Sequence, residues 1–152
     1  MKKCVMCGKS ALRQAEAELV REVAGHVFTA TIPALRCEAC GEEYTDGSDL
    51  GRFEVTIART LLDAGLRAGD VFKYARKAIG LRAADLATLL GMTPETISRW
   101  ETERHQVDPA ALAVLALLVR DRAAGSTATL DALRERAEPR KLPKRVALKL
   151  AS

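Results

Sequence analysis

Apolar positions follow two different spacings along this 152-residue chain, first a period of two and then a helical period. Residues 26–32 alternate apolar side chains with threonines, which predicts a β-strand that ends at Pro33. Residues 12–23 place apolar positions at helical spacing among good helix formers, so local propensity alone favours a helix there. Because Gly25 supplies a turn between the two segments, we predict instead a strand over residues 18–24 that forms a hairpin with the following strand.

From residue 48 onward the apolar positions follow the helical period. A first helix begins near Ser48 or Asp49, which have the residue types of an N-cap. Its buried stripe consists of Phe53, Ile57, Leu61 and Leu62. Glycines at positions 65 and 69 mark a linker, and five more helices follow in residues 70–138. The fourth of them contains the apolar run 109–119, and the fifth is capped at Thr127 or Thr129.

Two of the five helices have the spacing of a helix-turn-helix, with a turn at residues 90–93. Thr93 suits an N-cap and Pro94 suits the first helical position after it. The side chains expected to pack between these helices are Leu86, Ala87, Leu90, Ile97 and Trp100. A generic helical bundle has similar apolar spacing, so the case for DNA binding depends on polar residues. The candidate DNA contacts are Arg82, Thr93, Glu95, Thr96, Ser98 and Arg99. Further cations expected to hold the DNA backbone are Lys73, Arg76 and Lys77.

The four cysteines form two matched pairs, in CVMCGK at residues 4–9 and in CEACGE at residues 37–42. A two-residue spacer lets both sulfurs of a pair reach one ion at about 2.3 Å, and two pairs complete the tetrahedron of a structural zinc site. A glycine after each pair suits a tight turn with positive φ. We predict one structural zinc ion per chain, with the ligands Cys4, Cys7, Cys37 and Cys40. Four thiolates leave no position for water, so the site stabilises a fold and does not catalyse hydrolysis.

Three alternatives to zinc compete for these cysteines. Two disulfides lack a secretory context, because the N-terminus carries no apolar run of signal-peptide length. A redox dithiol normally has a single CxxC in a βαβ setting. One iron ion with four thiolates has the same ligand spacing, so the sequence leaves zinc and iron open, although nothing else indicates electron transfer.

The net charge of +4 is concentrated at the C-terminal end. Residues 134–152 contain seven basic and two acidic side chains, and the rest of the chain is close to neutral. Such a run is either a solvated surface or a contact with a polyanion. The predicted divisions are a zinc-binding ribbon domain at 1–47, a helix and linker at 48–69, a helix-turn-helix domain at 70–138 and a mobile basic tail at 139–152. The predicted fold class is α+β, with a small β-hairpin zinc domain followed by an all-α domain of five helices.

The composition excludes several other classes of protein. Two isolated histidines, with no Ser/His/Asp arrangement, phosphate loop or paired carboxylates, predict that the chain is not an enzyme. The run at 109–119 is too short to cross a bilayer, which requires about 20 apolar residues. We therefore expect a cytoplasmic protein without a membrane partner.

Both halves resemble known families. CVMCGK and CEACGEEY, with ATIPALRC leading into the second pair, resemble the YgiT-type zinc finger, and RKAIGLRAADLATLLGMTPETISRWETER is similar to the XRE/Cro helix-turn-helix. In this order, over residues 1–120, they resemble an MqsA-type antitoxin. The resemblance implies a zinc-stabilised N-terminal domain that binds a ribonuclease-type toxin, and a C-terminal domain that dimerises and binds operator DNA to repress its own operon.

Two positions depart from the XRE pattern. Arg82 and Ala83 stand where Thr or Ser, then Gln, commonly opens the helix before the turn. Arg99 matches a base-reading arginine, whereas Glu95 replaces a base-reading asparagine; glutamate accepts from cytosine N4 and repels phosphate. Two rival functions therefore stay open: a zinc-ribbon regulator without a toxin, and an interaction module that has lost DNA binding. The apolar helix containing residues 109–119 offers a face for a homodimer, which suits operator half-sites about 34 Å apart.

Overall fold

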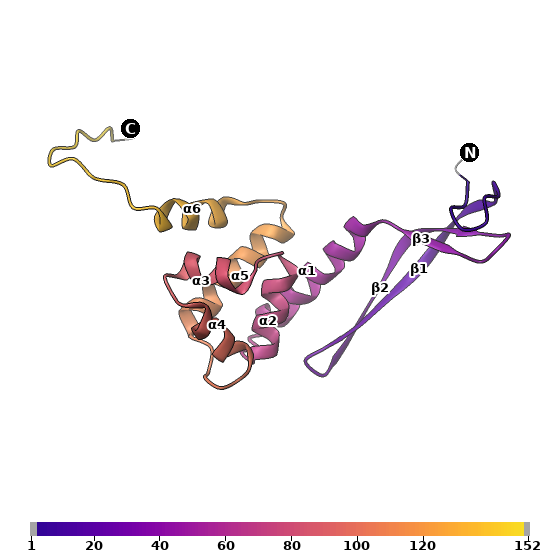
Figure 1. Cartoon of the computed structure of the whole chain (residues 1–152), viewed down its shortest axis with the longest axis horizontal. Helices are drawn as coiled ribbons and strands as arrows, with labels where there is room; N and C mark the ends of the chain where they lie inside the picture. Colours follow the sequence, from indigo (N-terminus) through magenta and orange to yellow (C-terminus); the bar gives the residue numbers. More distant parts are fainter. Residues whose placement is uncertain (1–2, 151–152) are drawn as a thin grey trace.

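Figure 1 shows the computed structural model, which describes residues 3–150 and has an α+β architecture. One antiparallel sheet contains β1 (Leu12–Val23), β2 (His26–Cys37) and β3 (Glu43–Thr45), in that order. Six helices follow: α1 (Gly47–Asp63), α2 (Gly69–Ala78), α3 (Ala83–Leu90), α4 (Pro94–Glu101), α5 (Pro109–Ala123) and α6 (Ala128–Ala137). A small sheet followed by helices confirms the predicted fold class. The outermost positions of the predicted ribbon and tail, 1–2 and 151–152, lie outside the described residues.

The hairpin of β1 and β2 is confirmed, and both strands are longer than predicted. Leu12 lies opposite Cys37 and Val23 opposite His26, so Ala24 and Gly25 alone form the turn, with φ of 51° and 76°. Positive φ at both positions is the geometry of a type I′ turn, whose twist matches that of the flanking strands. Burial overrides the helix propensity of residues 12–23, because Leu19, Val23, Phe28 and Ala30 share one face of the hairpin near its turn and pack with α1 there.

Pro33 does not end β2, contrary to the prediction. It lies opposite Glu16 within the strand, which continues to Cys37. β3 pairs with β2 only at residues 34–36. Within residues 3–150, Pro33 therefore lies where one side of β2 has no neighbouring strand, and the missing proline N–H is tolerated there. The longer strand brings Cys37 beside the start of β1.

α1 connects the sheet to the other helices. Its cap is Asp46 and not Ser48 or Asp49: the Asp46 carboxylate accepts a hydrogen bond from the Ser48 amide at 2.8 Å. The predicted stripe is buried or half-buried, at Phe53, Ile57, Leu61 and Leu62. This face packs with Val23 at the turn end of the hairpin and with Val71 of α2 in one apolar cluster. The hairpin is therefore fixed to the helices near its turn.

A second and larger apolar cluster lies among α1 to α5. As predicted, Trp100 belongs to this core; it is 5% exposed, and its ring meets Phe72 edge-on with 5.7 Å between centroids. α5 packs against α1, α2 and α6, so most of the apolar surface offered for a dimer is covered within the chain, and Leu117 stays 50% exposed. Among the described residues, no helix has the length and apolarity needed to span a membrane.

Candidate metal centre and nucleic-acid interface

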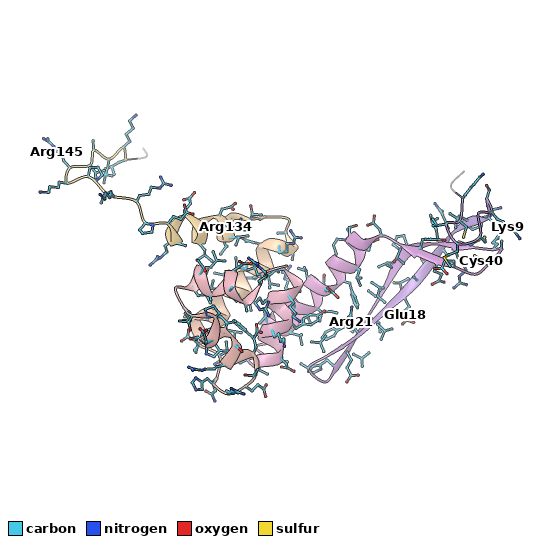
Figure 2. All side chains as sticks on the ribbon, in the orientation of Figure 1. Lys9, Glu18, Arg21, Cys40, Arg134 and Arg145 are labelled. Carbon is cyan, nitrogen blue, oxygen red and sulfur yellow. The ribbon has the colours of Figure 1, made fainter. Side chains whose placement is uncertain are left out.

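The strand register brings the two cysteine pairs together at the open end of the hairpin (Figure 2). Cys4 and Cys7 precede β1, Cys37 is the last residue of β2, and Cys40 lies in the turn before β3. All four Sγ atoms lie within 4.8 Å of one another, and the Cys4–Cys40 and Cys7–Cys37 sulfurs are each 3.6 Å apart. A tetrahedral zinc ion with Zn–S bonds of about 2.3 Å requires sulfurs about 3.8 Å apart. The four thiols therefore form a cage of the right size for one ion.

The two cysteine turns share one backbone conformation. The amide of Gly8 donates to the Cys4 carbonyl at 2.9 Å, and the amide of Gly41 donates to the Cys37 carbonyl at 2.7 Å. Both glycines have left-handed φ, 71° and 79°, which strains any residue with a Cβ. This repeated turn directs both sulfurs of each pair to the same side, and it gives the glycine of each motif its physical reason.

Tyr44 of β3 completes the first turn. Its hydroxyl lies 3.2 Å from the Cys4 sulfur and accepts hydrogen bonds from the amides of Val5 and Met6 at 3.1 and 3.3 Å. A group that binds a metal ligand in this way orients the ligand and tunes it. Tyr44 was not predicted as a site residue, and its position four residues after Cys40 is the signal that the sequence offers for it.

The pKa values of Cys4 and Cys40 are shifted in opposite directions. Hydrogen bonds from the Tyr44 hydroxyl and the Cys7 backbone lower the pKa of Cys4 to about 6. The backbone amide of Glu42 has the same effect on Cys40, but desolvation and the neighbouring thiols outweigh it and raise the pKa of Cys40 to about 12. Sulfurs this close repel one another when charged, so a divalent cation is the species that allows four thiolates at neutral pH.

The six predicted DNA contacts lie at the start of α3 and on α4. Arg82 is the N-cap residue of α3, and Thr93 caps α4 by accepting a hydrogen bond from the Thr96 amide at 3.3 Å. The remaining contacts are exposed except Thr96, which is half-buried: Glu95, Thr96, Ser98 and Arg99. The buried side of α4 carries Ile97 and Trp100, as predicted, and its polar side faces solvent.

Two arginines near α3 have different surroundings. Arg82 is exposed and donates to the Asp85 carboxylate at 2.8 and 2.9 Å, a pair that sequence analysis missed. Arg76 is buried between α2 and α4, where it donates to both Glu101 oxygens, at 2.5 and 3.0 Å, and to the Leu81 carbonyl at 2.7 Å. The prediction that Arg76 holds a DNA backbone is therefore wrong: each of its three guanidinium nitrogens donates a hydrogen bond inside the fold. Lys73 and Lys77 are exposed.

Comparison with known proteins adds one finding. A family model described as the antitoxin component of a bacterial toxin-antitoxin system, MqsA, matches residues 1–123. No curated protein matches the chain. The matched part contains all four cysteines and ends with α5, so α6 and the residues after it lie outside the match.

Proposed function

Since this chain belongs to the MqsA family of toxin-antitoxin antitoxins, we propose that it neutralises a ribonuclease-type toxin in the cytoplasm and represses its own operon as a DNA-binding dimer. The observation that carries the proposal is the extent of the match, because residues 1–123 include both the thiol cage and the α3–α4 pair. Each of the two activities then has its own surface on the chain.

The thiol cage supports a structural zinc ion held by Cys4, Cys7, Cys37 and Cys40. Thiolates favour zinc over hard cations, and the sulfur separations fit a tetrahedron. Four protein ligands fill the coordination shell, so the ion's contribution is to stabilise the open end of the hairpin. We expect this ribbon, residues 1–47, to be the toxin-binding domain, joined through residues 48–69 to the DNA-binding domain at 70–138.

The long hairpin supports the toxin-binding assignment. β1 pairs with β2 on one edge, and no strand of residues 3–150 pairs with its other edge. An unpaired strand of this length presents backbone donors and acceptors to a partner chain. Exposed Val20 and Val27 lie near the turn, 60% and 65% accessible, and add apolar contact area there. A toxin that adds a strand to this edge would use both features.

The α3–α4 pair supports the DNA-binding assignment as an XRE-type helix-turn-helix. The capped N-terminus of α4 and its exposed polar side suit insertion into a major groove, with Arg99 reading a guanine. Arg82, already oriented by Asp85, is placed for a phosphate contact. Glu95 suits a cytosine and changes the base preference relative to an asparagine at that position.

Two measurements test the two activities. Co-expression with the neighbouring open reading frame should restore growth that this reading frame alone arrests; unchanged arrest removes the antitoxin role. For DNA, Arg99→Ala should cost about 1 to 3 kcal/mol in binding to the duplex upstream of the chain's own gene. Arg13→Ala, at an exposed arginine of the hairpin, is the matched control and should bind as the parent does. Equal footprints from the parent and Arg99→Ala would exclude Arg99 from the readout.

A further inference from the structure

The positive charge of the chain is gathered in residues that follow the family match. Residues 140–149 contain five cations and no acid: Arg140, Lys141, Lys144, Arg145 and Lys149. All five are exposed, and residues 139–150, here named the arm, form no helix or strand. Prolines at positions 139 and 143 prevent α6 from continuing into the arm, because a proline lacks the N–H that a helix interior requires.

The arm cations have no carboxylate partner among the described residues, whereas about half of the arginines in the chain do. Eight arginines of the chain lie within ion-pairing distance of a carboxylate: Arg13, Arg21, Arg36, Arg52, Arg59, Arg76, Arg82 and Arg134. Within residues 3–150, no ion pair involves an arm cation. Figure 2 shows Arg145 in the extended segment beyond α6, away from the other helices. Five uncompensated cations on an extended segment form a strip of positive potential.

The positive strip begins beside the proposed DNA-binding helices. Leu130 and Leu133 of α6 pack against the core cluster that contains Leu86 of α3, so α6 lies along α3. The last turn of α6 carries Arg134, whose charge adds to the hydrogen bonds from Arg82 in lowering the pKa of Asp85. The C-terminal end of α6 is therefore close to the start of α3, where Arg82 lies.

We propose that the arm binds the DNA phosphate backbone beside the site occupied by α4. This rests on the proposed DNA-binding function. An extended segment of about 12 residues spans about 40 Å, and one turn of the duplex is about 34 Å long. The arm can thus reach along the duplex axis for about one turn from the start of α3. Lysine and arginine contacts to phosphate carry no sequence information, so the arm raises affinity for every duplex.

Apolar side chains in the arm offer an alternative to DNA binding, namely contact with a protein. Val146, Leu148 and Leu150 lie next to arm cations and are 45%, 78% and 88% exposed, and Leu142 is 81% exposed. If the arm docked on a protein through these residues, its cations would be dispensable for DNA binding. Phosphate binding instead depends on the charges and on their number, which salt titration counts.

The test compares three full-length proteins by fluorescence anisotropy at several salt concentrations. The neutral variant carries Arg140→Gln, Lys141→Gln, Lys144→Gln, Arg145→Gln and Lys149→Gln. The charge-conserving control exchanges Arg and Lys at the same five positions. Each protein is titrated with two duplexes of about three helical turns, one from upstream of the chain's own gene and one of random sequence. Circular dichroism should be the same for all three, since the arm has no packing contact in the core.

We expect the slope of log K against log[salt] to become shallower in the neutral variant, on both duplexes, by about 0.9 for each arm cation that contacts a phosphate and by about 4.5 if all five do. The control should keep the parent slope, because counterion release depends on charge. If the neutral variant binds with the parent slope, the arm does not contact phosphate and the proposal is overturned. If the parent itself binds neither duplex, the DNA-binding function fails and the arm fails with it.

Discussion

Replacing Arg76 by methionine removes the cation of a buried ion pair between α2 and α4 and leaves the anion, Glu101, in place. The Arg76 and Glu101 side chains are each 8% exposed, and two hydrogen bonds join them, at 2.5 and 3.0 Å. Arg76 also donates to the Leu81 carbonyl, at the turn before α3. Methionine fills much of the same volume with apolar atoms. The variant therefore leaves the Glu101 carboxylate buried without its cation, and the Leu81 carbonyl without its donor.

The expected cost is about 3 to 5 kcal/mol, because an uncompensated charge stays buried. This is a large share of the 5 to 15 kcal/mol that stabilises a typical domain. For a chain of this size it lowers Tm by on the order of 10 °C. The double variant Arg76→Met with Glu101→Leu removes both charges, and we expect most of the stability to return, since apolar replacements of a buried pair are often close to neutral.

Urea and thermal unfolding followed by circular dichroism measure these differences. Arg82→Met is the matched control. It breaks an arginine–carboxylate pair of similar distances in which the arginine side chain is 82% exposed, and it should change stability far less than Arg76→Met does, because solvent screens the pair. Equal losses in Arg76→Met and Arg82→Met would show that burial does not set the cost. A double variant as unstable as Arg76→Met alone would show that the unpaired carboxylate is not the cause.

Three other changes test separate parts of the chain. Cys37→Ser should reduce bound zinc below one per chain, measured by elemental analysis, while the helical signal persists; joint loss of both would contradict two separable units. Tyr44→Phe should weaken metal binding about 10- to 100-fold in a chelator competition. Tyr74→Phe, its control, removes a buried hydroxyl that has no partner in residues 3–150 and should leave the metal affinity unchanged. Gly69→Ala should cost about 1 to 3 kcal/mol of stability because a Cβ there overlaps the Trp100 carbonyl. Gly51→Ala, with open space around it, should be neutral or stabilising. Equal Tm values for these two variants would refute the steric reason.

Patterns that recur locally were readable from the sequence. The paired CxxCG motifs predicted the thiol cage because each one fixes its own turn, and the register of the hairpin needed only to bring the two together. The Thr93–Pro94 pair predicted the start of α4, where capping is a local hydrogen bond. These features depend on residues that are close in sequence, so single-sequence reasoning reaches them.

Features set by tertiary neighbours were not readable. Arg76 has the residue type of a phosphate contact, and only the packing of α2 against α4 shows that it is buried against Glu101. Pro33 ends a strand by local rules, and it is tolerated in β2 because β3 stops one residue away. Tyr44 reaches Cys4 across 40 positions of the chain. In each case the deciding contact joins residues distant in sequence, which no local pattern records.

The hairpin is held at its two ends by different forces. At the open end the four cysteines form the thiol cage, with Tyr44 against Cys4, and at the turn end Val23 packs with α1 and α2. The ion pair of Arg21 and Glu54, at 2.8 Å, lies between β1 and α1 and adds to the second attachment. If the thiol cage holds an ion, we expect loss of that ion to release the open end first, while the turn end stays fixed by apolar burial that needs no ion. The larger core packs on the other face of α1, so we expect it to stay folded when the open end is released.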